Sequence, residues 1–126
     1  MRAAPPPPVI QRGEIWDINF DPQVGAEVQK VRPAVVMSVT AAGRLPLRIV
    51  VPITTGRSGF TQYFWMVPVP GTPASGLDHD SFADAFQIKS VSVDRFVNRR
   101  GVVTQSILEE ISAAIMLCIG YSPPRV

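Results

Sequence analysis

The sequence predicts a small, mainly β domain: a strongly curved sheet or barrel that is closed by one C-terminal helix. Short apolar segments, separated by turns rich in glycine and proline, fill residues 14–103. Helical periodicity occurs once, at residues 106–120, and strands do not alternate with helices. A chain of 126 residues is long enough for one domain with a single core.

The first predicted strand is "EIWDINF", residues 14–20. Trp16, Ile18 and Phe20 face one way and Asp17 and Asn19 the other, which is the period of a half-buried strand. A long loop follows it, opened by an Asp-Pro pair and loosened by a glycine.

The next strand is predicted from "AVVMSV", residues 34–39, whose continuous apolar character indicates burial on both faces. Arg32 stands directly before Pro33 at the mouth of this strand. Proline restricts the preceding residue to extended backbone, so the direction of the Arg32 side chain is limited.

The middle of the chain predicts further strands. They span residues 47–53, 62–69 and, as one or two strands, 81–93, with a short strand or turn at 95–103. Thr54 and Thr55 are expected to open a second glycine-containing loop after the first of these strands, and residues 70–80 form a turn-rich connection.

The C-terminal helix is predicted from "SILEEISAAIMLCIG". Ser106 and Glu109 have the spacing of a capping box, and isoleucines recur every four residues along one face. Gly120 is expected to end the helix. We therefore divide the chain into a flexible proline-rich tail (1–11), a folded domain (12–121) and a C-terminal tail (122–126).

The composition limits the available chemistry. One histidine and one cysteine cannot make an ordinary structural zinc site, and no nucleotide-binding fingerprint occurs, so we expect no metal and no cofactor. His79 is interpreted as a turn residue and Cys118 as a small buried apolar residue. The absence of a secretory signal or membrane-length apolar run predicts a cytoplasmic protein with no membrane contact.

The basic residues are mostly arginine: ten arginines stand beside two lysines, with a net charge of only +2. The guanidinium fork suits phosphate or carboxylate, although a GC-rich genome would also enrich arginine. Polar groups predicted at strand ends are the candidate site, because a rigid sheet presents them.

Several segments together resemble the MazF/PemK toxins of type II toxin–antitoxin systems. They are "RGEIWDINFDPQVGAE", "VRPAVVMS", "VVPITT" and "FQIKSV", followed by a helix that ends in Ile-Gly, in this order across residues 12–120. The resemblance implies an SH3-like barrel, a homodimer, a MazE-like antitoxin and a metal-independent endoribonuclease. Such an enzyme cleaves single-stranded mRNA by attack of the 2′-OH, which leaves 2′,3′-cyclic phosphate and 5′-OH ends and inhibits translation and growth.

The resemblance also assigns residues. Arg32 and Thr54 take the catalytic positions, and Glu27, Ser81 and Gln87 take positions associated with RNA binding. We add three RNA-binding candidates from their chemistry: Thr55, Arg57 and Lys89. Phe60 or Tyr63 would stack on bases. Two positions depart from the family pattern, because Val28 stands where most members have glutamine and Phe86 where many have an acidic residue; both changes are expected to alter base recognition or loop packing.

Two other functions remain open from the sequence. A CcdB-like toxin of the same barrel superfamily would inhibit DNA gyrase by protein binding through its C-terminal helix. A non-catalytic SH3-like module would only bind a partner. The Arg-Pro strand and the "PITT" segment favour the endoribonuclease.

Overall fold

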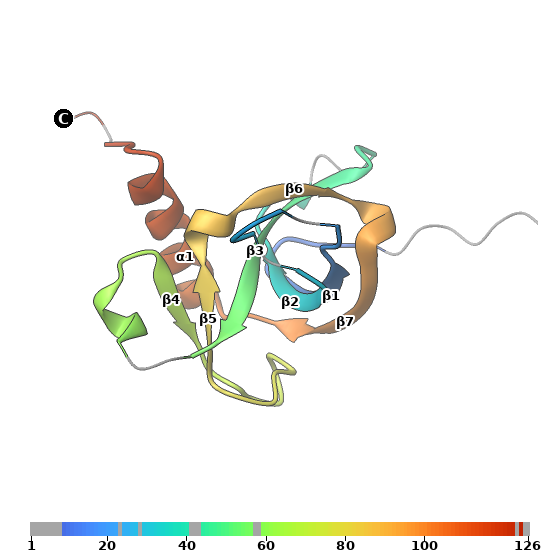
Figure 1. Cartoon of the computed structure of the whole chain (residues 1–126), viewed down its shortest axis with the longest axis horizontal. Helices are drawn as coiled ribbons and strands as arrows, with labels where there is room; N and C mark the ends of the chain where they lie inside the picture. The colour runs from blue at the N-terminus through green and yellow to red at the C-terminus, as the bar shows by residue number, and fades with distance from the viewer. Residues whose placement is uncertain are drawn as a thin grey trace, which may run out of the picture.

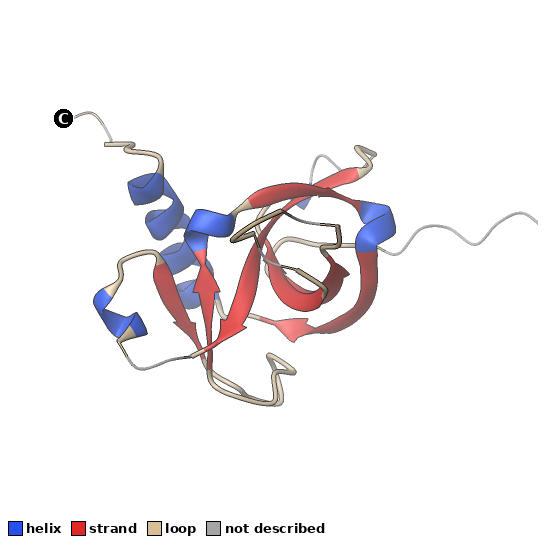
Figure 2. Cartoon of the chain, viewed as in Figure 1, coloured by secondary structure: helices blue, strands red, loops and turns tan. Residues whose placement is uncertain are grey.

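The computed structural model describes residues 9–22, 24–27, 29–40, 44–56, 59–122 and 124. Within these ranges the chain forms seven strands, all paired antiparallel, and one α-helix. Figure 2 shows the strands as a strongly curved sheet with the helix on one side. This arrangement confirms the predicted fold class.

The strands are β1 (Glu14–Asn19), β2 (Val31–Val36), β3 (Leu47–Thr55), β4 (Met66–Val69), β5 (Ser81–Asp84), β6 (Lys89–Ser92) and β7 (Phe96–Val102). The α-helix is α1 (Gln105–Cys118), and the 3-10 turns are η2 (Phe60–Gln62), η3 (Ala85–Gln87) and η4 (Val93–Arg95). The sheet order is β4-β5-β3-β2-β1-β7, and β6 pairs with the first half of β3. Because β6 leads through η4 into β7, the chain curls into the ring seen in Figure 1.

The sheet buries apolar side chains on both of its faces. Along β1, Ile15 enters a cluster under α1, whereas Trp16 and Ile18 enter a second cluster inside the ring. Phe20, just beyond the strand, is fully buried in the second cluster, so the predicted alternation is confirmed. Two cores on one sheet explain why β2 and β3 are continuous apolar runs.

The helix starts differently from the prediction. Thr104, one residue before the first turn, caps the helix: its Oγ1 accepts from the Ile107 amide at 3.2 Å. The predicted capping box of Ser106 and Glu109 is therefore wrong, because Ser106 already lies inside the first turn. The face that packs on the sheet buries Leu108, Ile111 and Ala114.

The helix ends as predicted. Gly120 has φ of 73°, and its amide donates to the Leu117 carbonyl at 3.1 Å. The Tyr121 amide donates to the Met116 carbonyl at 2.9 Å, which completes a Schellman motif.

Three predicted boundaries need correction. β3 continues through Thr55, so Thr54 and Thr55 belong to a strand and not to a loop. The predicted strand at 62–69 shortens to β4, because the chain before it turns through η2. β2 starts at Val31, so Arg32 and Pro33 lie inside the strand.

Two further predicted segments, the N-terminal tail and residues 95–103, can be compared with the structure. The proline run lies outside the described residues. Ile10, within the predicted tail, is only 2% exposed and packs in the second cluster inside the ring, here called the ring cluster. The segment at 95–103 contains a full strand, β7, which pairs with β1. In the described ranges no helix has the length and apolar character needed to cross a membrane.

Candidate functional site

A cavity of about 620 Å³, here called the main cavity, opens where β2, β3 and β5 end. Its lining residues are Ala26, Gln29, Arg32, Pro33, Pro52, Ile53, Thr54, Thr55, Phe60, Met66, Ser81, Asp84 and Gln87. Five of the residues predicted from the sequence are thus brought together: Arg32, Thr54, Thr55, Ser81 and Gln87. They come from three strands and a 3-10 turn, and the sheet register decides which of them meet.

The main cavity brings Arg32 and Thr54 together. The ladder between β2 and β3 ends at the pair Ala34 and Pro52, and each of the two residues lies two positions beyond that pair on its own strand. Thr54 pairs with Phe82 of β5. An arginine and a threonine from two different strands therefore line the same space.

Arg32 differs from five of the seven described arginines in having no partner among the described residues. Five described arginines have protein partners. Four donate hydrogen bonds: Arg12 to the Met37 carbonyl, Arg48 to Leu45 and Leu47, Arg95 to Asn19 and Asp21, and Arg99 to Glu14. The fifth, Arg100, forms ion pairs with Asp17 and Asp78. Within the described ranges, Arg32 and Arg44 have no such bond, and of these two Arg32 lines the cavity. Its guanidinium is therefore available to an anion.

The loop between β1 and β2 covers one side of the cavity. The Phe20 amide donates to the Lys30 carbonyl at 2.9 Å, and the Lys30 amide donates to Asp21 Oδ1 at 2.7 Å, which closes the neck of this loop. At its tip the Ala26 carbonyl accepts from Gln87 Nε2 at 3.5 Å. The loop is thus held at its neck and at its tip.

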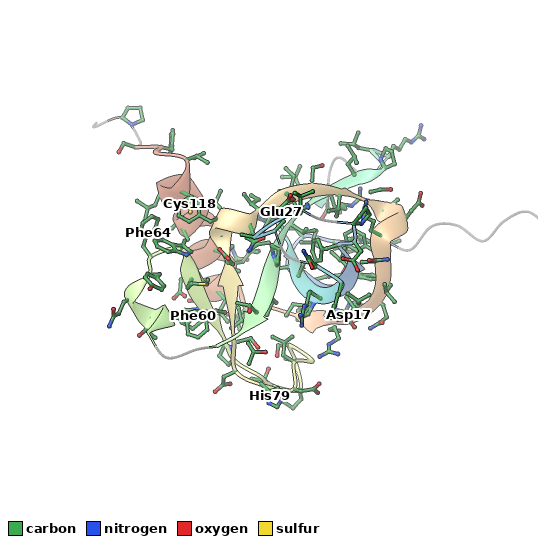
Figure 3. All side chains as sticks on the ribbon, viewed as in Figure 1. Asp17, Glu27, Phe60, Phe64, His79 and Cys118 are labelled. Atoms are coloured by element: carbon green, nitrogen blue, oxygen red, sulfur yellow. The ribbon has the colours of Figure 1, made fainter. Side chains whose placement is uncertain are left out.

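The hydroxyls of the site have different environments. Ser81 is 8% exposed, and its Oγ donates to the His79 carbonyl at 2.8 Å, so its proton is already used within the protein. Thr54 and Thr55 are exposed at the end of β3. His79 lies in the turn before β5 (Figure 3), as its interpretation as a turn residue predicted, and it is not among the residues that line the main cavity.

Asp84 is a cavity residue that the sequence analysis missed. It accepts from the Phe86 amide at 3.1 Å and caps η3. Burial raises the pKa of Asp84, and hydrogen bonds from Phe86 and Gln87 only partly oppose this. One signal could have found it: Asp84 is two residues beyond Phe82 on β5, and therefore on the face that carries Thr54. Gln29, also missed, lies in a loop and gave no comparable signal.

A second cavity of about 490 Å³ adjoins the main cavity. Its lining residues are Ala26, Glu27, Trp65, Asp84, Phe86, Gln87, Ile88 and Lys89. The predicted residues Glu27 and Lys89 line this second cavity and not the main one. Arg57, the remaining predicted site residue, lies outside the described residues.

The described residues contain no group of three histidine, cysteine, aspartate or glutamate side chains that could hold a metal ion. Cys118 is partly buried against the cluster under α1, where burial raises the pKa of its thiol. Figure 3 shows it on the helical side of the molecule.

Comparison with known proteins identifies relatives of this chain. Residues 11–119 match the family described as PemK-like, MazF-like toxin of type II toxin–antitoxin system. Endoribonuclease MazF9 of Mycobacterium tuberculosis is 31% identical over 115 residues, covering 86% of this chain and 95% of that protein. The endoribonuclease toxin MazF of Escherichia coli K12 is 34% identical over 114 residues, covering 89% and 96%.

Solved structures agree with the fold. MazF of Deinococcus radiodurans has a TM-score of 0.77 at 24% identity, over 90% of this chain and 98% of that one. The MazE–MazF complex of the same organism gives a TM-score of 0.71 at 26% identity, with the same coverage.

Proposed function

The chain belongs to the PemK-like, MazF-like toxin family of type II toxin–antitoxin systems, and on that premise we propose that it is a sequence-specific endoribonuclease. Its substrate is single-stranded RNA, chiefly mRNA, and its cleavage inhibits translation and growth. The observation that carries this proposal is the guanidinium of Arg32, which has no partner among the described residues and lines the main cavity together with Thr54.

The chemistry that fits these groups uses the RNA's own 2′-OH as nucleophile. The 2′-oxygen loses its proton and attacks the adjacent phosphorus, and the bond from phosphorus to the 5′-oxygen breaks. The products carry a 2′,3′-cyclic phosphate and a 5′-OH. No metal ion takes part in this scheme, and DNA, which lacks the 2′-OH, is bound without being cut.

Arg32 and Thr54 are assigned complementary roles. Charge that develops on the phosphoryl oxygens is stabilised by the Arg32 fork, which Pro33 holds in extended backbone. A guanidinium stays protonated at neutral pH, so Arg32 stabilises the transition state and donates toward the leaving oxygen instead of acting as a base. Thr54 donates a second hydrogen bond to the same phosphate. Thr55, Ser81 and Gln87 position the RNA strand in the main cavity, and Arg57 guides its backbone.

The proposed partners follow from the same surface. Solved relatives are described as complexes with MazE or with a cognate antitoxin. We assign this chain a MazE-like antitoxin whose acidic or extended segment covers Arg32, because a cationic cleft for RNA also binds carboxylates. Loss of antitoxin affinity in Arg32→Ala is expected; unchanged affinity would contradict this assignment.

A homodimer in the cytoplasm completes the proposal. Several large apolar side chains are exposed, among them Phe64 at 52%, Leu117 at 59% and Ile119 at 71%. Such exposure is typical of a surface that meets another protein. The cytoplasm is where mRNA is translated, so the substrate sets the location.

The test is incubation of purified protein with long single-stranded RNA in EDTA. Arg32→Ala is expected to lower the cleavage rate by roughly 10²–10³, the usual effect of losing one preorganised donor. Arg44→Ala is the matched control, since Arg44 also lacks a partner in the described ranges but lies before β3, at the end of that strand remote from Thr54. Cyclic-phosphate ends that form in Arg32→Ala at the wild-type rate would refute the role of Arg32. Intact RNA with an inhibited gyrase supercoiling reaction would instead identify a CcdB-like toxin.

A further inference from the structure

We propose that the second cavity is a nucleobase subsite in which the ring of Phe86 stacks on a base beside the cut phosphate, and the carboxylates of Glu27 and Asp84 select a base that carries an exocyclic amino group. This inference rests on the proposed function, because it names what the RNA offers next to the site of cleavage. It assigns specificity to Phe86 and Glu27 and leaves the reaction itself to the main cavity.

The two cavities adjoin each other. Ala26, Asp84 and Gln87 line both of them, so these residues form the partition between the cavities. Gln87 Nε2 spans this partition by donating to the Ala26 carbonyl. A strand whose phosphate is bound by Arg32 therefore passes this partition, and the base of an adjacent nucleotide enters the second cavity.

The aromatic wall of the second cavity is held from behind. The Phe86 ring meets Trp65 edge-on, with centroids 5.1 Å apart at 70°, and Trp65 is itself stacked on Tyr63 at 4.7 Å and 13°. Despite these contacts Phe86 remains 54% exposed. A fixed ring with an open face beside a polar cavity is the arrangement that stacks on unpaired bases.

The polar side chains of this cavity include two carboxylates, Glu27 and Asp84, beside Gln87 and Lys89. Glu27 Oε2 pairs with Lys89 at 3.8 Å and Oε1 accepts from the Val24 amide at 3.3 Å, and each carboxylate oxygen has lone pairs for a further donor. The amino groups of adenine, cytosine and guanine can donate to a carboxylate, as cytosine N4 does to glutamate or aspartate in nucleic-acid complexes. Uracil has no exocyclic amino group, and its one donor on that edge, N3–H, is flanked by two carbonyl oxygens that would face the carboxylates, so it is selected against.

The first experiment reads base preference from the cut sites of an RNA library that is randomised around one fixed segment. The wild type is expected to disfavour uracil at one position next to the cut. Phe86→Leu should reduce that preference about tenfold, whereas Phe86→Tyr, which retains an aromatic face, should keep it. Phe64→Leu is the matched control, because Phe64 is 52% exposed and contacts both Trp65 and Phe86 but does not line the cavity.

The carboxylate half of the inference has its own variant. Glu27→Gln replaces an acceptor by a group that also donates, so the discrimination against uracil should weaken. A base profile of Phe86→Leu identical to that of the wild type, or a wild-type preference for uracil in this position, would overturn the inference while leaving the endoribonuclease intact.

The second experiment does not depend on cleavage and separates the two proposals. The chain has two tryptophans: Trp65 lines the second cavity, and Trp16 is 7% exposed in the ring cluster. Titration with adenosine, cytidine and guanosine monophosphates should shift the indole N–H NMR signal of Trp65 and leave that of Trp16 unmoved, with a weaker effect of uridine monophosphate. Wild-type protein that cuts no RNA would refute the proposed function. Absence of a Trp65 shift with all four nucleotides would refute the subsite.

Discussion

Glu27 and Lys89, which are 62 residues apart in the chain, form an ion pair with 3.8 Å between Oε2 and Nζ. The pair joins the tip of the loop between β1 and β2 to the start of β6. Lys89 Nζ also lies 5.8 Å from the centre of the Phe20 ring, directly after β1. The loop that borders the main cavity is thus attached to the sheet by a contact that RNA phosphates could compete for.

Lys89→Gln is expected to weaken RNA binding while changing the free energy of unfolding by less than about 1 kcal/mol, because partly exposed ion pairs contribute little stability. If Lys89 contacts one phosphate of a single strand, the slope of log K against log salt should fall by about 0.7. Urea unfolding and anisotropy titrations at several salt concentrations measure the two quantities.

Lys30→Gln is the natural control for this variant, since Lys30 is the only other lysine and lines neither cavity. An unchanged salt slope in Lys89→Gln, or an equal fall in both variants, would remove Lys89 from the RNA-binding set.

Local patterns predicted β1 and the C-terminal helix well, because alternation and helical periodicity are properties of adjacent residues. They failed at residues 62–65, whose composition favours a strand. There Gly59, with φ of 90°, starts the η2 turn, and the Tyr63 amide donates to the Phe60 carbonyl. The aromatic side chains of this segment then pack on one another instead of against a paired strand.

The candidate site was predictable to the extent that it lies in motifs. Arg32 and Thr54 could be named from the resemblance, but their alignment depends on the register of β2 on β3. Asp84, Trp65 and Phe86 meet Glu27 only through long-range packing of η3 against the loop. No spacing in the sequence encodes that meeting.

Thr104→Ala should lower the free energy of unfolding by about 1 kcal/mol, since it removes the acceptor of the Ile107 amide at the start of α1. Ser106→Ala, two residues later and exposed inside the first turn, should change it by less than about 0.5 kcal/mol. Denaturant unfolding of the two variants compares the two positions directly. A larger loss in Ser106→Ala would restore the capping box that the sequence predicted.

Gly76→Ala should be more damaging than Gly120→Ala, although both glycines have φ near 70°. A Cβ on Gly76 would lie 2.0 Å from the Arg100 carbonyl oxygen, whereas a Cβ on Gly120 would have no atom of the described residues within 4 Å. Gly120→Ala therefore suffers only the left-handed backbone, roughly 1 kcal/mol, while Gly76→Ala must also displace β7 and should lose at least about 2 kcal/mol. Thermal unfolding of both proteins checks the ranking, and equal losses would contradict it.

The stability that Glu14 contributes should be lost in acid. Burial alone would raise the pKa of Glu14, but hydrogen bonds from the Gln11 amide at 2.7 Å, Arg99 Nε at 2.6 Å and Trp16 Nε1 at 3.2 Å outweigh it and lower the pKa. The folded state then binds fewer protons than the unfolded state, so this stability is present above the ordinary glutamate pKa and lost as the pH falls through the lowered value.

Glu14→Gln should accordingly lose about 2 kcal/mol at pH 7, because it weakens hydrogen bonds to a charged group, and the difference from wild type should shrink in acid. Urea unfolding across the acidic range measures this convergence. A difference that is independent of pH would show that packing, and not the carboxylate charge, makes the contribution.

Asp84 should show the opposite dependence on pH. Burial raises the pKa of Asp84 in the folded protein despite the hydrogen bonds from Phe86 and Gln87, so the folded state binds more protons than the unfolded state. Stability is then lost as the pH rises from the ordinary aspartate pKa through the raised value. Asp84→Asn keeps an N-cap for η3 but carries no charge, so it should be more stable than wild type at neutral pH and match it in acid. Urea midpoints of both proteins at acidic and neutral pH decide the question: a variant that is less stable at neutral pH would mean that the Asp84 carboxylate is stabilised as an anion by the groups lining the two cavities.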